Sequence, residues 1–280
     1  MISARRHGLL LGYMRPVFLV TLLWTVCAWG NVASGSSGDG SITPDAEMIL
    51  IPEGPFRIGS NKEDIDWIVR EFRSESREWY QDETPAQEIF VKSYYIDKFE
   101  VTNSQYEIYI KATGKLAPKY WGDPKFNSAR KPVVGISFQE ASDYCQWTGK
   151  RLPNEAEWEK AARGEDARKF PWGNEADPTR ANVFGTKDQN RYTAPVGTYP
   201  QGKSPYGVMD MAGNVWEWTS GWYIPYPDNR HKSEMFGETL KVMRGGSWNS
   251  NMDLARTAIR GKALPDQRQS YIGFRCIKRS

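Results

Sequence analysis

The part of this chain after about residue 165 lacks the regular spacing of apolar residues that marks helices and strands. Gly, Pro, Asn, Asp and Trp dominate this region, and its periodic runs are short. Turns and irregular segments should therefore prevail there. Such a region needs tethers other than backbone ladders, and we expect a disulfide, bound ions or buried Trp side chains with satisfied indole N–H groups.

The first half of the chain contains clearer signals. Residues 48–52 read as a strand, and no internal repeat argues for a solenoid or propeller. Two capping-box patterns and two further starts, each followed by a stop signal, predict helices. The four expected helices cover residues 61–79, Thr102 to Gly114, Ser137 to Gly149, and Asn154 to Gly164, with Trp158, Ala161 and Ala162 facing inward in the last.

The N-terminus reads as an export signal. Arg15 precedes an apolar run over residues 17–29, and small residues follow at 33–35. The run is shorter than the roughly 20 residues that span a bilayer, so we expect no permanent membrane span. We assign residues 1–34 to a signal peptide, with Met14 as an alternative start, 35–46 to a flexible linker and 47–280 to one domain. The protein is then exported, to a periplasmic or extracellular location.

Charge argues against a nucleic-acid partner. The formal net charge of +3 comes from Arg5, Arg6 and Arg15, and the residues after 34 carry 34 basic and 34 acidic side chains. A balanced mature chain has no electrostatic preference for a polyanion.

The cysteine count is informative in an exported protein. If Cys27 leaves with the signal peptide, Cys145 and Cys276 remain. An even pair in an oxidising compartment suggests a disulfide. The alternative is two buried free thiols that pack as small apolar residues.

Histidine is too scarce for several kinds of chemistry. Outside the leader, the only histidine is His231, in a polar stretch that reads as a solvated loop. His-based iron or zinc sites are therefore not expected. No Gly-x-Ser-x-Gly elbow or Gly-x4-Gly-Lys-Ser/Thr loop is present, which argues against a Ser-His-Asp hydrolase and a P-loop enzyme.

Several short motifs resemble, in combination, the formylglycine-generating enzyme family, also called sulfatase-modifying factors. These motifs are Arg244-Gly245-Gly246-Ser247-Trp248, Gly273-Phe274-Arg275-Cys276, Gly213-Asn214-Val215-Trp216-Glu217-Trp218 and the segment 150–158, which begins Lys150-Arg151-Leu152-Pro153-Asn154. The resemblance spans about residues 47–279. It implies an α+β fold, namely a single compact domain of the sulfatase-modifying-factor type, with low regular secondary structure and a loose likeness to C-type lectins. It also favours a disulfide between Cys145 and Cys276, because the matching cysteines pair in relatives.

The residues depart from the family where its oxidases carry out their chemistry. In those oxidases, two cysteines after the Gly-Gly-Ser turn bind copper and oxidise a substrate cysteine. The matching positions here hold Ser250 and Ala255. Copper(I) prefers soft thiolate ligands, so a hydroxyl and a methyl group should not retain it. We therefore expect neither copper nor a catalytic residue at these positions.

Calcium is the cofactor that the resemblance implies, in a structural role. Irregular loops supply the carboxylate, amide and carbonyl oxygens that calcium takes as ligands. On spacing alone the signal is weak, because Asp and Asn in turns usually cap backbone groups. The positions that match calcium ligands of the family fall in two sets: Asn182, Val183, Asp188 and Asn190 in the first, and Asp210, Gly213, Val215 and Glu217 in the second.

The function expected from these observations is a calcium-stabilised binding or accessory module without formylglycine-generating activity. Ser247, Trp248 and Asn249 match positions that line the substrate groove in relatives, and they could bind a peptide or small molecule. Alternatively, this turn only fixes the backbone and buries Trp248. Two further alternatives are an oxidoreductase of the family acting on another substrate, as in siderophore maturation, and residual formylglycine-generating activity. The sequence specifies neither the ligand nor the oligomeric state.

Overall fold

The computed structural model describes residues 46–185 and 190–280. The predicted signal peptide, nearly all of the predicted linker and Asp188 lie outside these residues. Among the described helices, none is long and apolar enough to cross a membrane.

Two small antiparallel sheets form the N-terminal part of the domain. The strand predicted at 48–52 is present as β1 (Met48–Ile51), and it pairs with β4 (Tyr94–Asp97). The last strand, β9 (Ile277–Arg279), pairs with the other edge of β4. The two ends of the described domain are thereby held together through one strand. A separate two-stranded sheet joins β2 (Gly54–Ile58) to β3 (Gln87–Val91).

All four predicted helices are present: α1 (Lys62–Phe72), α2 (Asn103–Thr113), α3 (Phe138–Trp147) and α4 (Glu155–Arg163). Each begins with a reciprocal capping box, which satisfies two of the free backbone N–H groups at its start. The prediction of one helix over 61–79 is wrong in length. The N-cap is Asn61, and α1 ends where Arg73 takes a left-handed conformation (φ 51°), before a separate 3-10 helix, η1 (Glu78–Glu83).

The expectation that turns and irregular segments prevail after residue 165 is confirmed, although the region also contains short strands. Up to residue 215, the described residues contain only isolated bridges and two 3-10 turns, η2 (Pro178–Arg180) and η3 (Pro200–Gly202). A four-stranded sheet follows, in the order β7-β6-β5-β8. Its strands are β5 (Trp216–Trp222), β6 (Lys241–Arg244), β7 (Gly261–Ala263) and β8 (Ile272–Gly273). All four residues of β6 and the first four of β5 are buried, so these strands lack the alternation of apolar and polar residues that would predict them from sequence.

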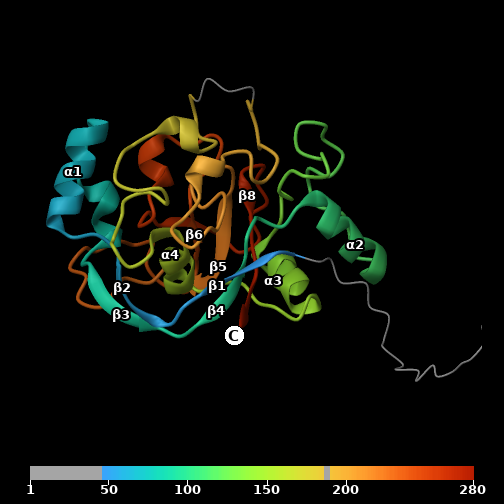
Figure 1. Ribbon diagram of the computed structural model, residues 1–280, viewed down its shortest axis with the longest axis horizontal. Helices are drawn as coiled ribbons and strands as arrows, with labels where there is room; N and C mark the ends of the chain where they lie inside the picture. Colours follow the sequence, from blue (N-terminus) through green and yellow to red (C-terminus); the bar gives the residue numbers. More distant parts are fainter. Residues whose placement is uncertain (1–45, 186–189) are drawn as a thin grey trace, which may run out of the picture. The chain divides into compact units, whose positions relative to one another are not determined.

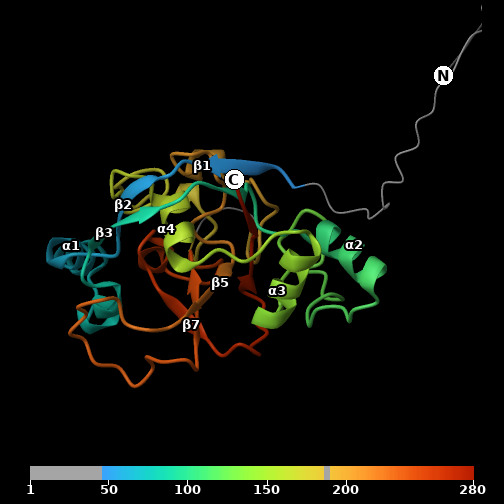
Figure 2. The same cartoon turned by 90° about the horizontal axis from the view of Figure 1, so that it is seen from below.

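The helices lie on different sides of the domain. Figures 1 and 2 show α1 at one side of the domain and the α2–α3 pair at the opposite side, with α4 and β5 between them. The predicted disulfide is present and joins Cys145 of α3 to Cys276. Tyr106, Tyr144 and Phe274 pack around it in one buried cluster. Since the bridge closes a loop of 131 residues, chain entropy gives it about 4–5 kcal/mol.

Helix α4 is the most deeply buried helix segment of the domain. Trp158, Ala161 and Ala162 are fully buried, as predicted, but Glu159 and Lys160 are fully buried too. Burial of a charge is stable only when the charge is paired and hydrogen-bonded. The Glu159 carboxylate meets that condition by pairing with Arg163 at 2.6 Å and with Arg244 of β6.

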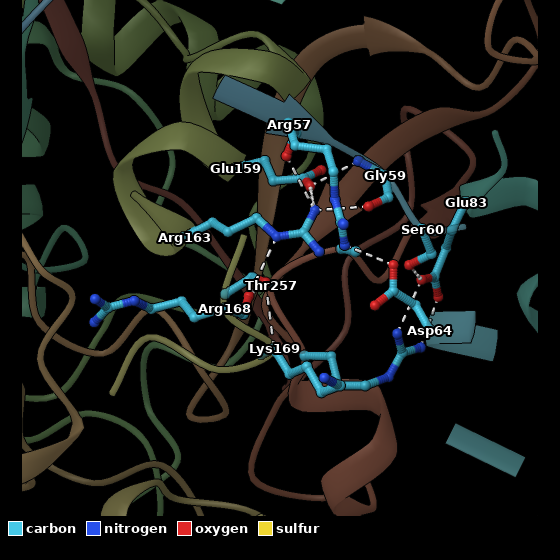
Figure 3. Close-up of polar contacts among 12 residues, drawn as sticks. Arg57, Gly59, Ser60, Asp64, Glu83, Glu159, Arg163, Arg168, Lys169 and Thr257 are labelled. Atoms are coloured by element: carbon cyan, nitrogen blue, oxygen red, sulfur yellow. Dashed lines mark hydrogen bonds and ion pairs between the residues drawn. The ribbon is translucent and has the colours of Figure 1, made fainter. Parts of the chain in front are cut away.

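The network of α4 reaches several irregular segments. Arg163 Nη1 donates to the carbonyls of Gly59 (2.7 Å) and Arg57 (3.2 Å), and the Gly59 N–H donates to Glu159 (2.8 Å). Figure 3 shows these contacts and a further hydrogen bond, from Arg163 Nε to the Arg168 carbonyl (3.2 Å). One turn earlier on the same face of α4, Glu155 pairs with Arg244 and Arg260. One short helix thus holds the end of β2 and the segments that carry Arg244 and Arg260.

Replacing Glu159 should test the weight of this network. In Glu159→Gln the side chain keeps its size, but Arg163 and Arg244 lose a buried counter-charge. We expect the free energy of unfolding to fall by about 3–5 kcal/mol, measured by urea denaturation. Glu63→Gln, at an exposed position of α1, is the control and should change stability by no more than about 0.5 kcal/mol. Equal losses in the two variants would contradict this account.

Candidate functional site

Two glycines after β6 create the turn on which the candidate site is built. Gly245 (φ 97°) and Gly246 (φ 75°) both have the left-handed backbone that glycine adopts without steric cost. A Cβ atom on Gly246 would lie 2.5 Å from the carbonyl oxygen of Leu254, and one on Gly245 would lie 3.0 Å from the Trp158 ring. The turn therefore packs directly between α4 and the 3-10 helix η4 (Met252–Ala255).

The two positions that match the family's cysteines are buried beside this turn. The Ser250 hydroxyl accepts from the backbone N–H of Ser247 (3.1 Å) and lies 2.9 Å from the Ser247 hydroxyl. Ala255 is fully buried in a small apolar cluster with Ala181, Val183 and Ala212. In the described part of the chain, the only two cysteines are bonded to each other. The site therefore contains a hydrogen-bonded hydroxyl and a methyl group where the oxidases have thiols.

A surface depression of about 470 Å³ opens next to this turn. Its lining residues are Val183, Phe184, Gly185, Asn190, Arg191, Tyr192 and Trp248. Of the residues expected in the groove, Trp248 lines it, Asn249 is exposed nearby, and Ser247 lies fully buried below the surface. The Ser247 hydroxyl donates to the side chain of Asn249 (2.7 Å), so it holds the turn. Sequence reasoning missed Phe184, Arg191 and Tyr192, because no motif marks them and only the tertiary fold brings them to Trp248.

The two segments with expected calcium ligands meet in space. Asn182 and Gly213 form an isolated parallel bridge, and the Asn214 N–H donates to the Asn182 carbonyl (2.8 Å). The Asn182 side-chain nitrogen donates to the Tyr192 carbonyl (2.8 Å) and to Asn214 Oδ1 (3.1 Å). The Asn182 side-chain oxygen is buried and has no hydrogen-bond partner among the described residues. An unpartnered buried amide oxygen is a suitable cation ligand.

The second segment lies in a buried cluster of carboxylates. Glu217 accepts from Arg275 Nε and Nη2 (both 2.7 Å) and from the Trp158 indole N–H (2.8 Å). Asp210 accepts from the Gly197 N–H (2.7 Å). Glu100, which sequence reasoning missed, accepts from the Asn214 amide (2.7 Å) through one oxygen, and its other oxygen has no partner among the described residues. Nothing local marks Glu100, since it lies more than 100 residues before its partners.

Burial and mutual repulsion change the pKa values in this cluster. Burial, with the charges of Asp210 and Glu217, raises the pKa of Glu100 well above its ordinary value. Burial also raises the pKa of Asp210 to about 6, although the Gly197 N–H and Arg275 oppose the shift. Among the described residues, no three His, Cys, Asp or Glu side chains converge as a ready-made metal site. A cation here would depend on amide and backbone oxygens as well as carboxylates.

Comparison with known proteins identifies the family. Residues 37–280 match the model of the sulfatase-modifying factor enzyme 1-like domain. The chain belongs to this family. Its relatives include the formylglycine-generating enzyme of Bos taurus, which is 29% identical over 87% of this chain and 78% of that protein. The hercynine oxygenase of Mycolicibacterium smegmatis is 32% identical over 81% of this chain and 60% of its own length.

Other relatives share the domain within longer or different proteins. A Chlamydia caviae protein named serine/threonine-protein kinase pkn1 is 36% identical over 83% of this chain, but the match spans only 38% of its length. Among solved structures, PvdO from Pseudomonas aeruginosa has a TM-score of 0.68 at 27% identity and covers 84% of this chain and 95% of its own. Treponema denticola variable protein 1, at 20% identity and a TM-score of 0.66 over 83% and 95% of the two chains, shows the fold alone. The expected family and the single compact α+β domain of C-type-lectin-like type are thus confirmed.

The Gly-Gly turn can be tested with three glycine variants. Gly246→Ala adds a methyl group in a left-handed conformation and against the Leu254 carbonyl, so we expect a loss of about 2–4 kcal/mol in the free energy of unfolding. Gly149→Ala has a similar φ of 70° but open space, and should lose about 1 kcal/mol. Gly221→Ala has neither problem and should be close to neutral. Equal losses for Gly246→Ala and Gly149→Ala in urea denaturation would show that close packing at the turn is unimportant.

Proposed function

We propose that this chain is an exported binding or accessory member of the sulfatase-modifying factor family, without copper-dependent oxidase chemistry. The observation that carries the proposal is the environment of Ser250 and Ala255. The Ser250 hydroxyl is hydrogen-bonded to the backbone N–H and hydroxyl of Ser247, and the Ala255 methyl group packs against apolar neighbours. Neither side chain supplies the soft thiolate that cuprous ion requires.

The aromatic depression next to the turn supports a binding role. Its volume of about 470 Å³ is within the range of small-ligand pockets, and Trp248 and Tyr192 are half-buried at its wall. A peptide segment or small molecule could occupy it without any reaction.

A second candidate is an oxidoreductase of the same family that acts on another substrate. A relative named hercynine oxygenase at 32% identity favours this possibility, because the shared domain occurs in a protein named for oxygenase activity. A stoichiometric redox metal or organic cofactor in protein purified from its native source would support this candidate over the binding module.

Reintroducing thiols should test the first proposal. The Ser250→Cys/Ala255→Cys double variant should gain about one tightly bound Cu(I) per chain, measured by competition with a chromogenic Cu(I) chelator, while the unmodified protein gains none at this turn. The Ser250→Ala/Ala255→Ser double variant is the control, since it changes the same positions without thiols. If the unmodified protein converts a Cys-x-Pro-x-Arg peptide to the aldehyde with copper and oxygen, above a metal-free control, the proposal is wrong.

We further propose that calcium stabilises the two loop segments described above. The first set would be Asn182, Val183, Asp188 and Asn190, and the second Asp210, Gly213, Val215 and Glu217. The unpartnered oxygens of Asn182 and Glu100 support a cation nearby. The three carboxylates of Glu100, Asp210 and Glu217 also outnumber the single Arg275. Glu217 fits least well, because Arg275 already neutralises it. Calcium would supply positive charge that offsets repulsion among the buried carboxylates.

The calcium effect should depend on pH. The raised pKa of Asp210 means that the metal-free fold gains from protonation at low pH, and this gain is lost as pH rises through about 6. Calcium competes with that proton. Saturating calcium should therefore raise the melting temperature by about 5–10 °C at pH 7.5, and by clearly less at pH 5. Calorimetry with calcium or a chelator gives the measurement.

Two variants sharpen this calcium test. Asp210→Asn removes the titrating group and should remove most of the difference between the two pH values. Asp228→Asn, at an exposed position, should retain it. A calcium response that is equal at both pH values, or unchanged in Asp210→Asn, would contradict the assignment.

A further inference from the structure

We infer that the depression beside the Gly-Gly turn recognises a negatively charged aromatic group, that is, an aromatic ring carried next to a carboxylate. The inference rests on the proposed binding function and names the ligand class of the same depression. Four features of the described residues lead to it: a fixed aromatic wall, an exposed aromatic rim, unpaired cations, and a lining without acidic side chains.

The aromatic wall is fixed before any ligand binds. Trp248 and Tyr192 meet edge to face, with ring centroids 5.3 Å apart. Buried Phe126 supports both rings, at 5.5 Å from Tyr192 and 6.2 Å from Trp248. The Trp248 indole N–H donates to the Ser270 carbonyl (3.2 Å), which sets the orientation of the ring. A rigid wall of this kind binds a planar group at a small cost in conformational entropy.

The rim offers a further aromatic surface. Phe184 lines the depression, and its side chain is 70% exposed. A large apolar side chain held in water next to two half-buried rings is more typical of a binding surface than of a packing defect. A flat ligand group between Phe184 and Trp248 would remove apolar surface from water on both sides.

The charge around these rings is positive. Lys125 Nζ lies 5.3 Å from the Tyr192 ring centroid, and Arg191 lines the depression with an exposed side chain. Within the described residues, neither cation forms an ion pair with a carboxylate. None of the described residues that line the depression is acidic. A group with a negative charge is therefore favoured, and an arginine-bearing peptide of the Cys-x-Pro-x-Arg type is disfavoured.

A carboxylate beside an aromatic ring can come from two sources: the C-terminus of a peptide that ends in Trp, Tyr or Phe, or a free aryl acid. Both present the same chemistry to Arg191, whose guanidinium can bind a carboxylate through two hydrogen bonds. The experiment uses both as probes. N-acetyl-Gly-Gly-Trp with a free carboxylate is compared with its C-terminal amide, and indole-3-acetate is compared with indole-3-acetamide.

We expect each acid to bind at least about 10-fold more tightly than its amide in isothermal titration calorimetry, because the amide lacks the charge that the cations attract. The advantage should shrink as salt is raised. If both acids bind, or only one, the shared chemistry is supported and the source is identified. If acid and amide bind equally, or if neither acid binds, the inference is overturned.

Variants locate the binding. Arg191→Gln and Lys125→Gln should each weaken binding of the acid about 5- to 10-fold and leave binding of the amide unchanged. Arg70→Gln, at an exposed position of α1, is the matched control and should have no effect. Phe184→Ser should weaken acid and amide equally, and its 70% exposed side chain makes unfolding a poor explanation for that result.

Failure here can be told apart from failure of the proposed function. Copper binding and peptide oxidation depend on Ser250 and Ala255, which are buried below the turn. If the protein has no oxidase activity and also does not bind aryl carboxylates, the first proposal stands and this inference is wrong. An acid advantage that persists in Arg191→Gln and Lys125→Gln would place the binding elsewhere and refute the site.

Discussion

The buried ion-pair network on α4 is the interaction on which the rest of the domain depends. Glu159 and Arg244 are both fully buried, and such charges are stable only when each meets a partner of opposite charge and satisfied hydrogen bonds. Arg244 also donates to the carbonyl of Thr257 (2.7 Å), while Arg163 donates to that of Gly59 (2.7 Å). Segments with little backbone ladder of their own are thereby fixed to one short helix.

The candidate site follows directly from that network. Arg244 is the last residue of β6, and the Gly245–Gly246 turn begins immediately after it. Pairing of Arg244 with α4 therefore determines where the Gly245–Gly246 turn lies. The position of that turn then fixes Ser250 and Trp248. Ser250 and Ala255 complete the packing of the turn without thiols, so the scaffold does not need cysteines at these two positions.

The carboxylates on the other side of the site raise a different physical problem. Glu100, Asp210 and Glu217 lie close enough to repel one another, and Arg275 neutralises only one of them by direct contact. Burial then favours protonation, which explains the raised pKa of Asp210. A bound cation would relieve the same repulsion at neutral pH. Protonation of these carboxylates and the stability of the loops are therefore linked, while the aromatic depression depends mainly on packing around Phe126.

The sequence by itself determined the features that depend on neighbouring residues. The four helices begin at local capping boxes, and the strand at residues 48–52 is continuous in apolar residues. The resemblance to the family places Ser250 and Ala255 at the positions where its oxidases have cysteines. Tertiary structure decided the rest. In the four-stranded sheet, all of β6 and the first four residues of β5 are buried, so these segments show no alternation of apolar and polar residues. Glu100 beside Asp210, and Arg191 beside Trp248, are joined by folding alone, because contacts across 50 to 110 residues leave no local pattern in the chain.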